Sequence, residues 1–195
     1  MHYSPNDANG GQGREVSLKN WRELTGFSEL YDYWNSGRVD GDLPLTDKFD
    51  LLAVTQWLPN IMLLDVFDRE NVVARFAGTA MVDRLGFDIT RENVFATQSD
   101  VSRDRVINAY SIIVNKPCGM VARYTNHYSS GRSGTVSTLY LPLKATANGN
   151  ARIVGMVHRE EDAGYAEPIE RTQSGTDIQS AEWVDLGFGV PSERP

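Results

Sequence analysis

Two short apolar runs joined by a polar turn decide the fold: Ile61-Met62-Leu63-Leu64-Asp65-Val66-Phe67, then Asp68-Arg69-Glu70-Asn71, then Val72-Val73-Ala74-Arg75-Phe76-Ala77. Runs of this length and composition, separated by turn residues, predict a β-hairpin. Gly78-Thr79 then begins a short predicted helix over residues 79–85, and Gly86 lies just past its end, where glycine commonly terminates helices.

Two helices are predicted before the hairpin. In residues 24–36, the side chains of Phe27, Leu30, Tyr31 and Trp34 recur at helical spacing on one face. A second helix is expected over residues 47–58. Pro59 ends it, because the residue before a proline is pushed out of the helical conformation.

A long helix and three strands are predicted after the hairpin. Asp100 is a good N-cap, and an amphipathic stripe then runs to Asn115. Strands are expected over residues 118–128, 135–143 and 151–158. The element order predicts an α+β fold with a five-stranded antiparallel sheet, helices on one face and an added N-terminal helix. A cavity between sheet and helices is the usual position for a small ligand.

The 195 residues suit one domain with appendages. Residues 1–20 are expected to be a disordered lead-in, because they are polar and rich in Gly and Asn. Residues 21–160 form the predicted domain with its flanking N-terminal helix. Residues 161–195 form a polar tail with an apolar docking segment near residues 182–190. Docking of this segment on the domain and docking on a partner are both open.

Composition restricts the partners and the compartment. The formal net charge of −7 argues against a nucleic-acid groove and against docking on an anionic membrane. No apolar run approaches the roughly 20 residues of a membrane span. A single cysteine, Cys118, fits a reducing compartment. We therefore expect a soluble, cytoplasmic protein.

An ordered set of motifs resembles a known family. Leu30-Tyr31-Asp32-Tyr33-Trp34 is similar to its tryptophan-bearing helix, and Leu58-Pro59 to the leucine-proline step into its first strand. The family's segment after the second strand is similar to Gly78-Thr79-Ala80 and Gly86-Phe87-Asp88-Ile89-Thr90. The end of a later strand of the family is similar to Leu141-Pro142-Leu143. Residues 185–191 resemble a tail seen in some members. The family is the short bacterial PAS class, the fifth PAS class of domain catalogues.

The resemblance implies a PAS fold and a sensory role in bacterial signal transduction, through a small ligand, a partner protein or both. It carries no catalytic set, so no catalytic residue and no enzyme activity are expected. The sequence has no attached kinase, cyclase or DNA-binding segment, and the signal is therefore expected to pass to a separate signalling protein.

Tyrosines are the first candidate ligand-binding residues. Side chains alternate along a strand, so Tyr124 and Tyr128 share a face with Met120 and Asn126, whereas Arg123 and His127 share the other. Cross-strand aromatic packing and hydroxyls aimed at a ligand are both open. Arg75 either faces inward and anchors an anion or faces outward as a solvated charge. The complete candidate set is Arg75, Met81, Tyr110, Tyr124, His127 and Tyr140.

Cofactor signals are weak. His127 and His158 lie near strand ends, where a haem ligand and a rim histidine are both open, and no histidine pair has metal-ligand spacing. Cys118 begins a predicted strand, whereas the flavin-adduct cysteine of light-sensing PAS domains lies on a helix. Haem, flavin and metal are therefore not expected.

Two alternatives to a sensor remain. One is a small α+β enzyme, an isomerase or hydratase, with His127 and Asp65 as the first suspects for an acid or base. The other is an interaction module with a filled core. The apolar stripe of the N-terminal helix also predicts a homodimer, although capping of the sheet by that helix is equally open.

Overall fold

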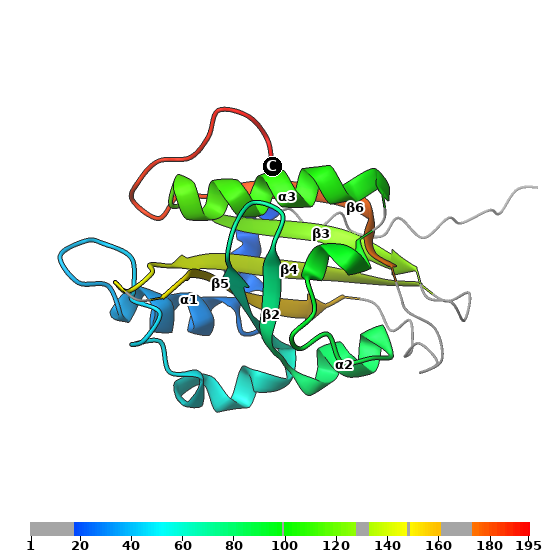
Figure 1. Cartoon of the computed structure of the whole chain (residues 1–195), viewed down its shortest axis with the longest axis horizontal. Helices are drawn as coiled ribbons and strands as arrows, with labels where there is room; N and C mark the ends of the chain where they lie inside the picture. The colour runs from blue at the N-terminus through cyan, green and yellow to red at the C-terminus, as the bar shows by residue number, and fades with distance from the viewer. Residues whose placement is uncertain (1–17, 99, 128–132, 148, 161–172) are drawn as a thin grey trace, which may run out of the picture.

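The computed structural model describes residues 18–98, 100–127, 133–147, 149–160 and 173–195. An antiparallel sheet of six strands, in the order β2-β1-β5-β4-β3-β6, forms its centre (Figure 1). The strands are β1 (Ile61–Val66), β2 (Val72–Ala77), β3 (Gly119–His127), β4 (Ser133–Leu143), β5 (Ala151–Arg159) and β6 (Gln173–Val184). The predicted α+β fold class and the predicted hairpin are confirmed.

Three α-helices and three 3-10 helices complete the described chain. They are η1 (Leu18–Glu23), α1 (Phe27–Ser36), η2 (Leu51–Asn60), α2 (Thr79–Leu85), η3 (Val94–Thr97) and α3 (Asp100–Asn115). The bounds of α2 and α3 agree with the sequence prediction. Gly86, with φ of 75°, adopts the left-handed conformation and donates its N–H to the carbonyl of Val82, which ends α2.

The helices cover both faces of the sheet, not one face as the sequence suggested. On one face, Phe27, Leu30 and Trp34 of α1 are fully buried against alternate residues of the central strands. On the opposite face, α2, η3 and α3 pack over the other set of alternate residues. The N-terminal helix therefore caps the sheet and forms its second layer. We call these two sides the α1 face and the α3 face.

The sixth strand is the second difference from the prediction. β6 pairs antiparallel with β3 and extends the sheet beyond the five predicted strands. It lies in the segment that the sequence placed in the tail. Residues 1–17 of the predicted lead-in lie outside the described residues, whereas residues 18–23 form η1.

The predicted second helix is also different. Residues 51–60 form the 3-10 helix η2, which is kinked at Val54 (φ −123°, ψ 33°). The side chain of Asp50 accepts a hydrogen bond from the N–H of Leu52 and caps the start of η2. Because of this kink and of the tighter turn of a 3-10 helix, the segment is not the regular α-helix that the apolar spacing suggested.

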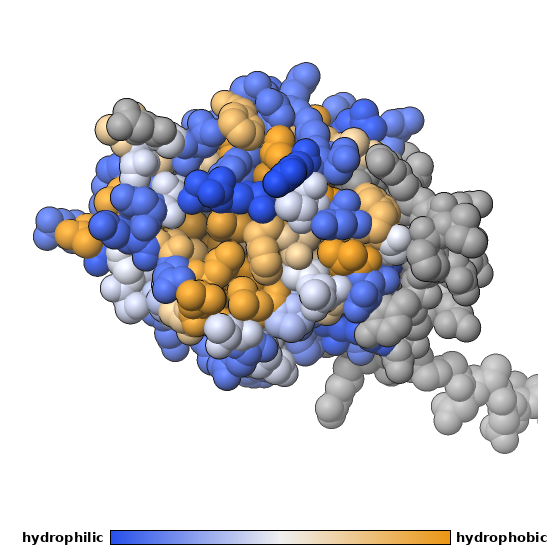
Figure 2. Space-filling model, turned by 60° about the horizontal axis from the view of Figure 1, so that its bottom comes forward, coloured by the Kyte–Doolittle hydropathy of each residue, from blue (hydrophilic) through white to orange (hydrophobic). Residues whose placement is uncertain are grey.

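The surface that carries η2 is partly apolar. Figure 2 views the molecule from this side and shows hydrophobic side chains gathered near the centre, framed by hydrophilic ones. Leu52 of η2 is the most exposed large hydrophobic residue, at 72%. In the described part of the chain, no helix is both long and apolar enough to cross a membrane.

Candidate functional site

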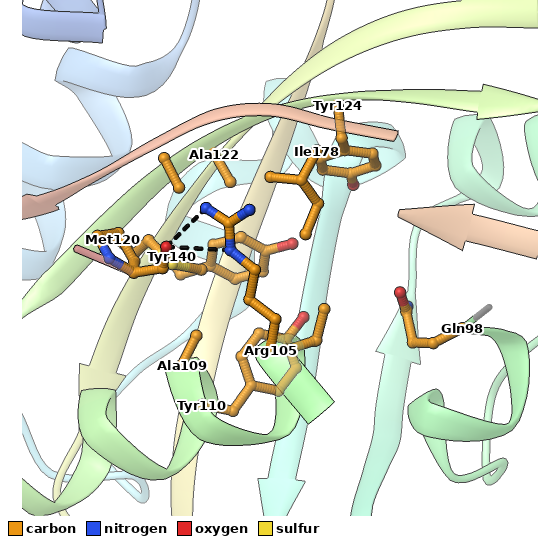
Figure 3. Close-up of a pocket in the computed structure, with 12 residues that line it drawn as sticks. Gln98, Arg105, Ala109, Tyr110, Met120, Ala122, Tyr124, Tyr140 and Ile178 are labelled. Carbon is orange, nitrogen blue, oxygen red and sulfur yellow. Dashed lines mark hydrogen bonds between the residues drawn. The ribbon is translucent and has the colours of Figure 1, made fainter. Parts of the chain in front are cut away.

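Two adjoining hollows lie between the sheet and the helices of the α3 face. The first, of about 50 Å³, is lined mainly by α3, β3, β4 and β6, and the second, of about 60 Å³, extends toward α2. Each has room for several water molecules or for part of a small organic molecule. Their walls share Gln98, Tyr110, Tyr124 and Tyr140. We call the two together the tyrosine cavity (Figure 3).

Three tyrosines from three elements meet in this cavity. Tyr110 comes from α3, Tyr124 from β3 and Tyr140 from β4. The rings of Tyr110 and Tyr140 lie 5.4 Å apart between centroids, and each hydroxyl influences the pKa of the other. The hydroxyl of Tyr124 also influences the pKa of Tyr140, and its oxygen lies 3.1 Å from Oγ1 of Thr138. The result is a cluster of hydroxyl groups inside an otherwise apolar wall.

Burial sets the protonation state of these hydroxyls. Tyr110 and Tyr140 are each only 5% exposed. Desolvation raises the pKa of both phenols well above the usual value near 10, because an apolar surrounding disfavours the phenolate. The hydroxyls therefore remain neutral donors and acceptors at physiological pH.

Strand alternation positions the β3 side of the cavity. Met120, Ala122, Tyr124 and Asn126 are alternate residues of β3, and all four line the tyrosine cavity. The shared face that the sequence predicted for Met120, Tyr124 and Asn126 is therefore confirmed. Tyr128, which was predicted to follow them, lies outside the described residues.

The second hollow has polar groups that the sequence did not single out. Arg84 of α2 is 6% exposed, and its Nη1 lies 3.5 Å from Oδ1 of Asn60. Asn126 is 5% exposed, and its Oδ1 has no hydrogen-bond partner among the described residues. A buried amide oxygen is almost always satisfied in a folded protein. The available signal for Asn126 was its place on the strand face of Tyr124.

Of the other predicted site residues, one lines the cavity and one points to solvent. Met81 of α2 lines the second hollow together with the three tyrosines. Arg75 of β2 points to solvent with a side chain that is 55% exposed, and its Nη1 lies 3.4 Å from Oδ2 of Asp65. The structure thus favours the solvated-charge interpretation for Arg75. The side chain of His127 lies outside the described part, although its backbone belongs to β3.

The segment after β6 lies beside the first hollow. Arg105 of α3 extends across this hollow and donates from Nε and Nη2 to the carbonyl of Pro195, at 3.1 and 2.7 Å (Figure 3). Nε1 of Trp183 donates to the carbonyl of Glu193 at 2.7 Å. Pro195 itself lines the hollow. Within the apolar segment near residues 182–190, Val184 and Leu186 are buried on the α1 face, whereas Phe188 and Val190 are exposed.

The described walls of both hollows contain no Asp, Glu or His side chain. Asp65, one suspect for an enzyme, accepts from Nε of Arg152 at 2.5 Å and also faces Arg75. Cys118 is fully buried just before β3, and burial raises the pKa of its thiol to about 11. It does not line either hollow. Within the described ranges, no group of three or more His, Cys, Asp or Glu residues could hold a metal ion.

Comparison with solved structures gives distant likenesses. The blue-light photoreceptor Aureochrome1 LOV in its light state shares 17% identity at a TM-score of 0.40, over 56% of this chain and 88% of that chain. The PAS domain of an HTR-like protein from Haloarcula marismortui shares 14% at 0.40, over 56% and 91%. A fungal LOV domain photoreceptor shares 16% at 0.45, over 73% and 99%. No curated protein matches the chain.

A family model gives the stronger result. The model described as "PAS domain", of the fifth PAS class, matches residues 23–158, which is more than half of the 195 residues. The matched range begins before α1 and ends in β5, so it contains α1 and both walls of the second hollow. The resemblance inferred from the motifs is confirmed, and the chain belongs to the PAS domain family.

Proposed function

We propose that this PAS domain is a sensory module that binds a small molecule in the tyrosine cavity. One observation carries the proposal: the cavity combines apolar walls with a few convergent polar groups, which is the usual composition of a small-molecule site. The family match to a PAS domain supports the sensory role.

The incomplete filling of the α3 face supports ligand binding over a purely structural role. Protein cores are packed as densely as organic crystals and contain few voids larger than a water molecule. Two hollows of about 50 and 60 Å³ that share four wall residues depart from that density. A structural module would be expected to fill this space with side chains.

The chemistry of the walls supports binding over catalysis. Isomerases and hydratases need a positioned acid or base, which is commonly a carboxylate or imidazole with a shifted pKa. The described walls contain neither, and the tyrosine hydroxyls are too weakly acidic to exchange a proton readily near neutral pH. Binding without chemistry is therefore the function that this site supports best.

The signalling context completes the proposal. Ligand binding is proposed to alter how the domain contacts a separate signalling protein in the bacterial cytoplasm. A homodimer through the N-terminal helix is also proposed. Because Phe27, Leu30 and Trp34 are already buried inside the chain, such a dimer would use the exposed side of α1. Light scattering after size exclusion tests this part, since a monomer at high concentration contradicts it.

A cavity-filling variant tests ligand binding. Val157 of β5 lines the second hollow and is 4% exposed, so Val157→Phe should place a ring in the space proposed for the ligand. The matched control is Val39→Phe, the same change at a residue that is 67% exposed. The assay is the thermal midpoint of each protein with a panel of small molecules: phenol, indole, toluene, benzoate and butanol.

We expect at least one compound to raise the midpoint of the wild type and of Val39→Phe, because a ligand that binds only the native state stabilises it. The same compound should have no effect on Val157→Phe. A panel without effect on the wild type, or an equal effect on all three proteins, would contradict the proposal.

A further inference from the structure

Asn126 lines the second hollow, and a buried polar atom of its side chain lacks a partner among the described residues. It lies on β3 opposite Gly134 of β4, with its side chain on the same strand face as Tyr124. The residue is 95% buried, and Oδ1 has no hydrogen-bond partner among the described residues. A carbonyl oxygen can only accept, so a donor from a ligand would satisfy it.

The surroundings of Asn126 favour an uncharged ligand. The phenols of Tyr110 and Tyr140 have strongly raised pKa values, which shows that this space disfavours a buried charge. The cation in the wall, Arg84, keeps contacts within the chain, with Oδ1 of Asn60 among them. A cationic ligand would be repelled by Arg84, and a carboxylate could not donate a hydrogen bond to Oδ1 of Asn126.

The remaining wall favours a flat ring. Met62 and Met81 line the second hollow together with the ring of Tyr140. Methionine sulfur and aromatic side chains make favourable contacts with the faces and edges of rings. The adjoining hollows of about 50 and 60 Å³ together restrict the ligand to a small molecule.

We propose that the tyrosine cavity selects small, uncharged ring compounds that carry one hydroxyl or N–H donor, and that this donor bonds Oδ1 of Asn126. The proposal rests on the proposed function and names the class of ligand for the same site. Phenol is the simplest member of the class. Toluene matches its size but lacks the donor, and benzoate carries a charge.

The test is calorimetric titration of the full chain with phenol, toluene and benzoate. For the wild type, we expect phenol to bind about tenfold more tightly than toluene, the factor expected of one neutral hydrogen bond in a buried site. Benzoate should bind most weakly. In Asn126→Leu, which replaces the amide by an apolar group of similar size, phenol should lose its advantage, and toluene should bind at least as tightly.

The outcomes separate the two proposals. Equal wild-type affinities for phenol and toluene, or tightest binding of benzoate, would overturn the ligand class but leave ligand binding by the cavity intact. Unchanged preference for phenol in Asn126→Leu would overturn the role of Asn126. Failure of all three compounds to bind the wild type would overturn both proposals. The wild-type series alone decides the ligand class if Asn126→Leu does not fold.

Discussion

The two faces of the sheet are built from alternate residues of the same strands, yet they are packed differently. On the α1 face, Gly26 lies so close to its neighbours that an added Cβ would be 2.0 Å from Cε of Met156 and 3.0 Å from the ring of Trp57. On the α3 face, the space between the helices and the sheet holds the two hollows of the tyrosine cavity. Both faces have a buried core, but the α3 face also contains unfilled space.

The side chains explain this difference. Large residues of α1 interlock with aliphatic residues of the central strands, and Nε1 of Trp34 donates to the carbonyl of Pro142 at 2.7 Å. On the α3 face, rigid tyrosine rings and polar groups replace part of the aliphatic packing. Rigid rings cannot change shape to fill the remaining space.

The largest expected effect comes from truncation of Trp34. Trp34→Ala should lower the free energy of unfolding by about 3–5 kcal/mol, because the residue is fully buried and its removal leaves a cavity and an unpaired carbonyl. Urea denaturation measures this change. The control Leu52→Ala, at an exposed site, should stay within about 0.5 kcal/mol. A small loss for Trp34→Ala would show that α1 is dispensable for the fold.

Two methionines allow a matched comparison of the faces. Met156 is 1% exposed and packs on the α1 face, whereas Met120 is 5% exposed and lines the first hollow. Met156→Ala should cost about 2–5 kcal/mol. Met120→Ala should cost at least about 1 kcal/mol less, because a side chain beside a hollow loses fewer contacts. Equal costs in urea denaturation would argue that the two faces are packed alike.

The smallest expected effect is a pH dependence from His158 on the α1 face. Its ring packs edge-on against Phe27 at 6.2 Å, and desolvation lowers its pKa below the usual 6.5, although the charge of Glu160 opposes this shift. Below pH 6.5 the unfolded chain binds a proton at this site more readily than the folded chain. Stability from this group is therefore present above pH 6.5 and is lost as pH falls through the lowered folded value.

His158→Gln should make the free energy of unfolding less steep between pH 7 and pH 5, as measured by urea denaturation at each pH. The difference between variant and wild type isolates this group from the carboxylates, which titrate in both. If the free energy of unfolding changed equally with pH in the two proteins, His158 would have the same pKa in the folded and the unfolded chain, which would contradict this prediction.

Much of the fold could be predicted because its signals are local. The caps and the apolar stripe define α2 and α3, and the turn at residues 68–71 defines the hairpin. The alternation of side chains along a strand also predicted that Tyr124 and Asn126 lie on one face of β3, as the structure shows.

The unpredicted features depend on contacts between distant residues. β6 contains mostly small and polar residues, and its strand conformation comes from pairing with β3, which side-chain periodicity does not reveal. The outward direction of Arg75 follows from its place on the edge strand β2 beside Asp65. In the sequence, Asn126 resembles any polar strand residue, and only the structure shows that its oxygen is buried without a partner among the residues it describes.

The contrast between the faces is tested most directly by methyl NMR of the methionines during a phenol titration. Met62 and Met81 line the second hollow and Met120 the first, whereas Met156 lies on the α1 face as an internal control. We predict that phenol shifts the methyl signals of Met62 and Met81 most and that of Met120 less. The methyl signal of Met156 should not move. Unmoved signals for all four residues, or a shift of Met156 as large as that of Met62, would contradict it.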